Sequence, residues 1–170
     1  MIFDDIEFVK VADFEEASPR AYTVGGKKSD DKWTASLKML DERYAKAERN
    51  CYLIVVDGNP VYVGEYQWNL ATRMIQLDKS NGLLYFNHHK WKEVQTELEN
   101  GRKVELFLCL YPYVRLGNRI ENAAKTIEQS LLDGNSQKLV WNKRGSNTSY
   151  YSGWTDRHCL RIDDLVKTQF

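Results

Sequence analysis

Two short apolar runs near the middle of the chain flank a tight turn. Residues 51–56 and 61–64 are almost entirely apolar, and Asp-Gly-Asn-Pro separates them. This arrangement is the short-range signature of a β-hairpin. Because a hairpin brings its two ends together, we expect Tyr52 in the first strand and Tyr62 in the second to be neighbours.

The chain before the hairpin carries two other patterns. Residues 6–11 alternate loosely between apolar and polar, which predicts a half-buried strand, and the Ser-Pro at 18–19 and the Gly-Gly at 25–26 are expected to interrupt it. Residues 30–48 repeat apolar side chains at steps of three and four, which predicts an amphipathic helix that Ser29 caps. The apolar face of that helix would be Trp33, Leu37, Leu40, Tyr44 and Ala47.

Further elements are predicted after the hairpin from the same periodicities. They are a short helix that begins after Asn69 and carries Arg73, a turn at 81–82, a helix at 87–99, a strand at 103–111, a helix at 118–133 with Gly134 just past its end, and a last short helix at 156–166. Asn69 is expected to cap the short helix, and Asn100-Gly101 is expected to end the helix at 87–99.

The order of these elements, β-β-α-α-β-α, predicts an α/β (α+β) fold with a small, mainly antiparallel three-stranded sheet flanked by helices. A chain of 170 residues is most simply one domain. With 42% hydrophobic and 12% aromatic residues, it has enough apolar surface to form a core.

Composition also bears on location and on cysteine chemistry. No apolar run approaches the ~18 residues of a transmembrane helix, and the acidic start lacks the features of a signal peptide, so we expect a cytoplasmic protein. Cys51, Cys109 and Cys159 are single and widely spaced, which speaks against a disulfide framework or a zinc site. The first two are expected to act as small apolar residues in strands.

Charge does not by itself point to nucleic acid. Twenty-four basic residues balance twenty-four acidic ones, whereas a strongly basic balance is typical of nucleic-acid-binding domains. A local patch is nevertheless enough for binding. Basic residues collect among aromatic ones in the C-terminal quarter, at Lys138, Lys143, Arg144, Arg157, His158 and Arg161. This mixture suits phosphate contacts and base stacking, and it equally suits a solvated loop.

One set of residues stands out by its order along the predicted elements. Its members are Tyr52, Tyr62, Arg73, Glu128 and Asn142. Glu128 lies at the edge of the apolar stripe of its helix, where a carboxylate is unusual without a partner. A structural interpretation stays open for each: core tyrosines, a solvated arginine, a surface glutamate and a turn asparagine.

This set resembles the GIY-YIG nuclease superfamily. The Tyr-Val-Gly that ends at Gly64 matches the second motif, and Tyr52 in Asn-Cys-Tyr retains the tyrosine of the first. Arg73 resembles the arginine of the helix that follows, Glu128 the glutamate of a later helix, and Asn142 the terminal asparagine.

The resemblance covers part of the chain and implies its organisation. It extends over residues 50–145 and looks closest to the compact branch that contains phage endonuclease II and some type II restriction enzymes. Within a single domain of residues 1–170, it leaves an N-terminal addition at 1–49, with the helix near 30–48, and a C-terminal addition at 146–170.

The resemblance also implies an activity: a Mg²⁺- or Mn²⁺-dependent endonuclease that hydrolyses phosphodiester bonds. In this interpretation Glu128 is the metal ligand, which suits a hard cation that takes its other ligands from water and phosphate. Arg73 offers permanently charged donors to phosphate oxygens. Tyr52 or Tyr62 positions or deprotonates the attacking water, and Asn142 holds the site together by hydrogen bonds.

Two features depart from the family pattern. Glu65 follows the second motif directly, where it would either repel phosphate or supply a second metal ligand. No histidine lies shortly after Arg73, although His88 and His89 follow later. If these two lie on a helix, their side chains point about 100° apart, so we expect surface or DNA-backbone contacts rather than chelation of one ion.

The expected partner is double-stranded DNA, in a restriction or phage-related setting. Cutting both strands with one small site requires a dimer or successive nicks, so we expect a homodimer whose interface the helix at 30–48 or the C-terminal segment supplies. Two alternatives remain: a nucleic-acid-binding module that has lost catalysis, favoured by Glu65 and the zero net charge, and a structural or interaction protein in which the motif arose by chance.

Overall fold

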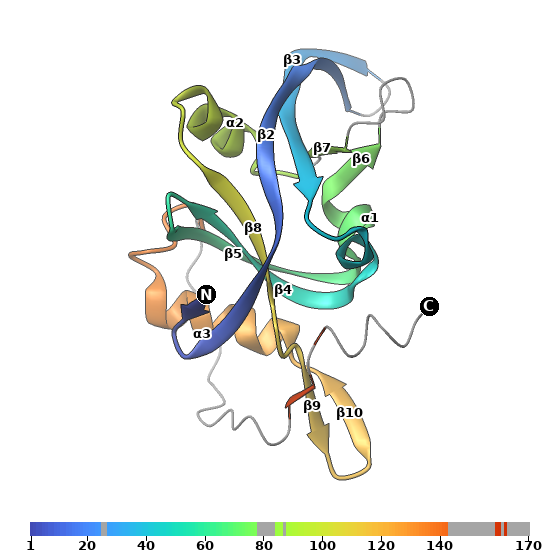
Figure 1. The fold of residues 1–170 in the computed structure, drawn as a ribbon, viewed down its shortest axis with the longest axis vertical. Coiled ribbons are helices and arrows are strands. Elements are labelled where there is room, and N and C mark those ends of the chain that lie inside the picture. The colour runs from blue at the N-terminus through green and yellow to red at the C-terminus, as the bar shows by residue number, and fades with distance from the viewer. Residues whose placement is uncertain (25–26, 78–83, 87, 143–158, 161, 163–170) are drawn as a thin grey trace.

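One antiparallel sheet organises the chain. The computed structural model describes residues 1–24, 27–77, 84–86, 88–142, 159–160 and 162. The sheet has eight strands in the order β5-β4-β8-β2-β3-β7-β6, with β1 paired to β2 (Figure 1). A second sheet of three strands has the order β10-β9-β11. The chain is therefore an α+β fold in which every strand pairing is antiparallel.

The bounds of the elements are as follows. The strands of the large sheet are β1 (Ile2–Phe3), β2 (Ile6–Val24), β3 (Lys27–Met39), β4 (Glu48–Val56), β5 (Asn59–Asn69), β6 (Ile75–Leu77), β7 (Leu84–Phe86) and β8 (Val104–Cys109). Those of the small sheet are β9 (Tyr113–Leu116), β10 (Arg119–Asn122) and β11 (Cys159–Leu160). The helices are α1 (Leu70–Met74), α2 (Trp91–Glu99), α3 (Ala124–Asn135) and the 3₁₀ helix η1 (Glu42–Lys46).

The predicted hairpin is confirmed as β4 and β5. Its two-residue turn places Asp57 at φ 47° and Gly58 at φ 80°, the left-handed backbone that a tight hairpin turn with matching twist requires. The Asp57 carboxylate accepts hydrogen bonds from Lys103 N and Arg102 Nε at 2.9 and 2.8 Å. These bonds tie the turn to the start of β8, which pairs with β4 on its other side.

Alternate residues of β4 divide between two apolar cores. Tyr52, Ile54 and Val56 belong to a core that contains residues of α1 and α2, whereas Cys51, Leu53 and Val55 belong to one that contains residues of α3. All six are buried because β4 lies inside the sheet and is covered on both faces. Cys51 and Cys109 are buried thiols outside any disulfide, which confirms their predicted role as small apolar residues.

The three predicted strands are only part of the sheet. The strands β5, β4 and β8 are adjacent, as the predicted hairpin and third strand require, but β2 continues the sheet beyond β8. The prediction of a three-stranded sheet is therefore wrong. It failed because β2 and β3 form a long hairpin, whereas the sequence predicts only a short strand at 6–11 and a helix at 30–48 in this segment.

The predicted helix at 30–48 is wrong. Residues Lys27–Met39 form β3, and only Glu42–Lys46 are helical, as the 3₁₀ helix η1. The segment 33–39 reads Trp-Thr-Ala-Ser-Leu-Lys-Met, so apolar residues also recur at every second position, which is the period of a strand. Pairing of Leu37 with Phe14 in β2 selects that period.

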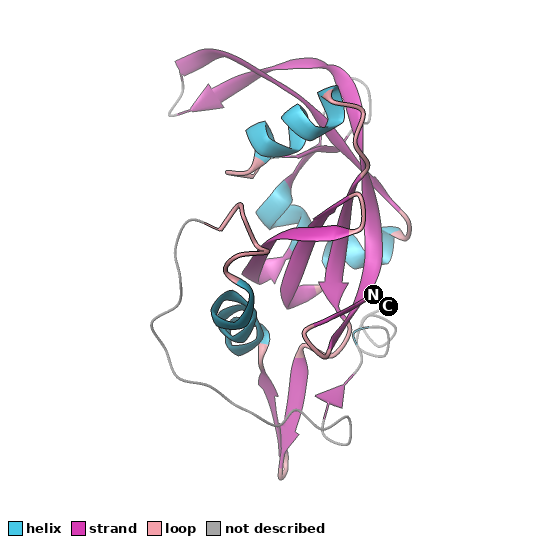
Figure 2. Ribbon diagram, turned by 90° about the vertical axis from the view of Figure 1, so that its left-hand side faces the viewer, coloured by secondary structure: helices cyan, strands magenta, loops and turns pink. Residues whose placement is uncertain are grey.

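Three boundaries also differ from the sequence predictions. β2 continues through residues 18–19, where a register shift between Glu16 and Arg20 accommodates the proline. The predicted helix at 118–133 begins only at Ala124 and extends past Gly134, because residues 113–122 form β9 and β10, which project as a ribbon (Figures 1 and 2). Cys159–Leu160 form β11 instead of the predicted helix at 156–166.

Other predicted elements are confirmed. The Asn69 side chain accepts a hydrogen bond from Thr72 N at 2.7 Å and so caps α1. Helix α2 ends at Glu99, Asn100 is its C-cap, and Gly101 follows at φ 72°. The predicted turn at 81–82 lies outside the described residues. No helix in the described parts of the chain combines the length and apolar character needed to cross a membrane.

Candidate active site

The two motif tyrosines lie side by side on one face of the hairpin. Tyr52 pairs with Gly64 and Ile54 with Tyr62 across β4 and β5. The ring centroids of Tyr52 and Tyr62 are 5.9 Å apart, which confirms that they are neighbours. Tyr52 is 0% exposed and Tyr62 is 7% exposed.

Gly64 is required by the position of Tyr52. A Cβ atom built at Gly64 would overlap the Tyr52 phenol. The Tyr52 ring therefore crosses the neighbouring strand where no side chain stands in its way. This contact gives the glycine of the Tyr-Val-Gly motif a packing role.

His88 holds the hydroxyl of Tyr52. Its Nε2 lies 2.8 Å from the Tyr52 oxygen, and its Nδ1 accepts a hydrogen bond from Lys90 N at 3.2 Å. The side chain is 5% exposed. Burial, followed by the charges of His89, Arg73 and Lys90, lowers the pKa of His88 to about 2, so the ring is neutral.

The surface position predicted for His88 is therefore wrong. Both histidines precede α2, which begins at Trp91. Because the backbone at 88–90 is not helical, the two rings do not diverge as consecutive helical residues do. Their centroids are 4.0 Å apart, and both face the tyrosines.

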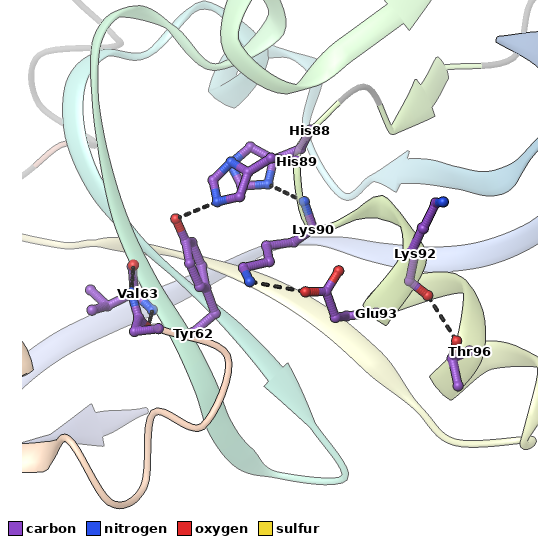
Figure 3. Close-up of polar contacts among 9 residues, drawn as sticks. Tyr62, Val63, His88, His89, Lys90, Lys92, Glu93 and Thr96 are labelled. Carbon is purple, nitrogen blue, oxygen red and sulfur yellow. Dashed lines mark hydrogen bonds and ion pairs between the residues drawn. The ribbon is translucent and has the colours of Figure 1, made fainter. Parts of the chain in front are cut away.

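His89 contacts the second tyrosine from the solvent side. Its Nε2 lies 3.2 Å from the Tyr62 hydroxyl (Figure 3). Burial, together with the charges of Lys90 and Arg73, lowers the pKa of His89. Lys90 is itself buried, places its Nζ 5.7 Å from the centre of the Tyr62 ring and forms an ion pair of 2.9 Å with Glu93.

Arg73 and Glu128 act electrostatically on the same two phenols. Burial raises the pKa of both Tyr52 and Tyr62, the charge of Glu128 raises it further, and the charge of Arg73 opposes the rise. Arg73 is exposed near the end of α1, and Glu128 is half-buried on α3. Both helices contact β5, the strand that carries Tyr62, but α3 packs in the other apolar core from the two tyrosines.

Glu65 lies close to Glu128. Burial and then the charge of Glu65 raise the pKa of Glu128, while the Gln129 side chain and the backbone amide of Glu65 favour the charged carboxylate. The Glu65 side chain accepts a hydrogen bond from Gln67 Nε2 at 2.6 Å. Two neighbouring carboxylates repel one another unless a cation lies between them.

This pair offers the oxygen donors that Mg²⁺ and Mn²⁺ prefer. In their donor chemistry the two residues fit a divalent ion, and Glu128 and Glu65 would be its protein ligands. Within the described residues, no group of three or more metal-ligating side chains is found. Two carboxylates suit Mg²⁺, which keeps several waters and takes further ligands from substrate phosphate.

Asn142 closes the free edge of β5. Its Oδ1 accepts a hydrogen bond from Val63 N at 3.0 Å, and its Nδ2 donates to Val63 O at 2.8 Å. The backbone N–H of Trp141 also donates to Val61 O at 2.9 Å. Asn142 thus pairs with the residue between Tyr62 and Gly64, and it fixes the edge strand without reaching the phenols.

Of the six predicted basic residues, the structure describes one. Lys138 is exposed in the turn after α3. The other five members lie outside the described residues. They are Lys143, Arg144, Arg157, His158 and Arg161.

Sequence reasoning missed Lys90 and the placement of both histidines. The sequence shows the His-His dipeptide at 88–89. Because it lies far from Arg73 along the chain, the sequence does not relate it to the tyrosines. A buried lysine between them and α2 has no local sequence signal, because its burial depends on the packing of α2 against β2, β3 and β8. Comparison of the chain with family models, curated proteins and solved structures finds no match.

Proposed function

We propose that this chain is a metal-dependent DNA endonuclease of the GIY-YIG type. One observation carries the proposal: Tyr52 and Tyr62 lie 5.9 Å apart, ring centre to ring centre, on the β4–β5 hairpin, and α1 with Arg73 and α3 with Glu128 both contact β5. A cation, a carboxylate and neighbouring proton-transfer groups are the parts that phosphodiester hydrolysis requires. The substrate we propose is double-stranded DNA, cut at specific sites by a cytoplasmic restriction or phage-related enzyme that acts as a homodimer.

Each side chain has a defined task in this reaction. The exposed guanidinium of Arg73 binds the scissile phosphate and offsets its growing negative charge. The tyrosine hydroxyls orient the attacking water and accept its proton. Asn142 fixes the edge strand β5 through its two hydrogen bonds to Val63, and so fixes the position of Tyr62.

The two carboxylates would bind the metal ion. Glu128 and Glu65 would hold Mg²⁺ or Mn²⁺, which when bound supplies positive charge at the phosphate oxygens. Glu128 is half-buried on α3, and the Gln129 side chain and the backbone amide of Glu65 favour its charged form. Glu65 departs from the family pattern, and as a metal ligand it would contribute to the reaction.

A second candidate is a nucleic-acid-binding module without catalysis. The proximity of Glu65 to Glu128 favours it, since two uncompensated carboxylates repel a phosphate. In that case the residues near Tyr62 form a structural cluster, and any DNA contact lies elsewhere.

Cleavage of supercoiled plasmid in magnesium tests the proposal. Glu128→Gln and Arg73→Ala are each expected to lower the cleavage rate by about 100-fold or more, the loss typical when a charge-stabilising group is removed. Chelation of the metal should abolish cleavage by the unaltered protein. Gel-shift assays on the same DNA report binding separately.

Matched controls come from the same helices. Asp133→Asn on α3 and Thr72→Ala on α1 change exposed side chains and should leave the rate unchanged. Binding without cleavage would favour the module. Absence of both cleavage and binding, on DNA and on RNA, would contradict the proposal and the module alike.

A further inference from the structure

We propose that the tip of the β9–β10 ribbon, residues 115–120, enters the major groove of duplex DNA and reads base edges with Arg115 and Arg119. The ribbon projects beyond α3 and the large sheet (Figures 1 and 2). This inference rests on the proposed function for the class of substrate, and it names the part of the chain that selects the DNA sequence.

The base of the ribbon is fixed to the rest of the chain. The Tyr113 hydroxyl donates a hydrogen bond to the backbone oxygen of Glu48 at 3.0 Å. The Asn122 side chain donates to the backbone oxygen of Arg49, and it accepts a hydrogen bond from the N–H of Ala124, the first residue of α3, at 3.2 Å. An isolated two-stranded ribbon is only marginally stable, so these bonds hold the ribbon in one direction relative to β4 and α3.

The tip of the ribbon is a tight hairpin turn that lies beyond the third strand of its sheet. Leu116 pairs with Arg119 across a two-residue turn, and Gly117 in that turn adopts φ 60°, as two-residue hairpin turns require. Of the described residues of β11, both pair with residues 113–114 of β9. Residues 115–120 are all exposed and are therefore available to a partner.

Each face of the tip carries one arginine beside one aliphatic side chain. Residues that pair directly across two strands point to the same face. Leu116 pairs with Arg119, and Arg115 pairs with Ile120. Leu116 is 57% exposed and Ile120 is 51% exposed. Exposed apolar side chains grouped with charges mark an interaction surface.

The charge of the tip favours a polyanion as the partner. Residues 113–120 contain two arginines and no carboxylate. Within the described part of the chain, neither Arg115 nor Arg119 forms an ion pair. DNA supplies negative charge to both arginines, whereas the same tip of a second copy would bring two more arginines and no carboxylate.

The dimensions of the tip match the major groove. This groove is about 12 Å wide and 8.5 Å deep and admits a two-stranded ribbon, whereas the minor groove is only about 6 Å wide. At about 3.3 Å per residue, two or three residues of each strand fit within that depth, which covers both arginine-containing pairs. The next pair, Val114 with Glu121, then lies at the mouth of the groove, outside the base edges.

The side chains at the tip suit base edges as well as phosphates. Arginine donates two hydrogen bonds to O6 and N7 of guanine, and apolar side chains contact the methyl group of thymine. The tip therefore carries two groups for guanine, Arg115 and Arg119, and two for thymine, Leu116 and Ile120.

The ribbon leads directly into the helix that carries Glu128. Strand β10 ends at Asn122, α3 begins at Ala124, and Glu128 lies about one helical turn further on. The base sequence under the tip thus sets where Glu128 meets the DNA backbone, and sequence reading is joined to the proposed metal site by a short, fixed connection.

Binding to a selected duplex tests the two arginines. Wild-type protein is first used to select duplexes from a random library with the divalent metal chelated, so that nothing is cut. Arg115→Gln and Arg119→Gln are each expected to lower the affinity for the selected duplex by about 10-fold or more, the usual loss for an arginine–guanine contact.

The matched control is Lys38→Gln on β3, which also removes one positive charge from a side chain that is 68% exposed and should leave the affinity unchanged. Wild-type affinity in both arginine variants would overturn the inference. So would a wild type that selects no sequence, because base reading requires a preference.

Base analogues test which groove the tip enters. The N7 atom of guanine lies in the major groove, so 7-deazaguanine in the selected duplex should weaken wild-type binding and should not weaken the arginine variants further. Deoxyuridine in place of thymidine, which removes the methyl group, should weaken the wild type more than Ile120→Thr. Wild-type binding that neither analogue affects would overturn the inference.

The mass of the free protein separates DNA from a second copy as the occupant of the tip. Leu116→Ser with Ile120→Ser should keep the wild-type mass in sedimentation equilibrium and the wild-type circular dichroism spectrum. A lower mass in the double variant would assign the tip to an interface between copies and overturn the inference.

Failure of this inference is distinguishable from failure of the proposed function. Wild-type protein that binds its selected duplex through the two arginines but never cleaves DNA would contradict the nuclease and support the ribbon. Cleavage and binding that do not depend on Arg115 or Arg119 would contradict the ribbon alone. Absence of any DNA binding would contradict both.

Discussion

Three tyrosines on one face of the hairpin differ in how their hydroxyls are satisfied. Tyr52 and Tyr62 contact histidine nitrogens, whereas the buried hydroxyl of Tyr66 has no partner among the described residues. A buried polar group without a hydrogen bond costs free energy. Tyr66→Phe is therefore expected to leave the free energy of unfolding unchanged or raise it by about 1 kcal/mol.

Urea denaturation checks this prediction. Tyr52→Phe provides the comparison, because it removes a hydroxyl that His88 satisfies and should lower the free energy of unfolding by about 1 kcal/mol. Equal losses in the two variants would show that the Tyr66 hydroxyl has a partner.

His88 should make stability depend on pH in the weakly acidic range. Its pKa falls from 6.5 to about 2 in the folded chain, so between these values the unfolded chain binds more protons. Stability is then fully present above pH 6.5 and is lost as the pH falls, by about 2 kcal/mol between pH 6.5 and 5.

Denaturation of wild type and His88→Gln at several pH values measures this effect. The variant should lose most of the slope, while His89→Gln should lose less because its side chain is exposed. The carboxylates with lowered pKa values, Asp41, Asp57 and Glu105, act only below their ordinary values of 3.8 to 4.5. An unchanged slope in His88→Gln would contradict the prediction.

At the scale of elements, β5 is an edge strand that side chains cap. A free edge exposes backbone donors and acceptors that invite unwanted pairing, and Asn142 satisfies both groups of Val63. Asn142→Ala removes two hydrogen bonds and should lower the free energy of unfolding by about 1–3 kcal/mol. Urea denaturation measures the loss, with exposed Gln137→Ala from the same segment as a control.

The same elements show which parts of the fold local sequence can specify. The β4–β5 hairpin, the Asn69 cap and the end of α2 were predictable because each depends on residues a few positions apart. The β2–β3 hairpin was not, since residues 33–39 satisfy both a helical and a strand period, and only pairing with β2 decides between them.

The candidate site likewise has a part that the sequence predicts and a part that depends on tertiary packing. The order of Tyr52, Tyr62, Arg73, Glu128 and Asn142 along the chain was visible in the sequence. The approach of His88, His89 and Lys90 to the tyrosines was not, because it depends on how the segment before α2 packs over the sheet. The effect of Glu65 on the pKa of Glu128 was likewise not visible, because it depends on how α3 packs beside β5.

At the scale of the whole molecule, the proposed reaction limits how duplex DNA is cut. In that proposal each chain of 19.9 kDa carries one Tyr62–Arg73–Glu128 set and would cut one strand at a time. The segment at 30–48, predicted as a helix and a possible interface, instead contributes to β3 and to the 3₁₀ helix η1, and the C-terminal segment is the other predicted source of the contact. Two antiparallel DNA strands are related by a twofold axis, which a symmetric homodimer matches.

The proposed homodimer leads us to expect a particular mass and a particular cleavage pattern. Sedimentation equilibrium should give twice the chain mass of 19.9 kDa, and linear plasmid should appear without accumulation of the nicked circle. Addition of excess Glu128→Gln protein should then form mixed dimers that cut one strand, so nicked circles accumulate. A monomeric mass, with nicked circles preceding linear DNA in the wild type and no effect of the added variant, would show that single chains cut the two strands in succession.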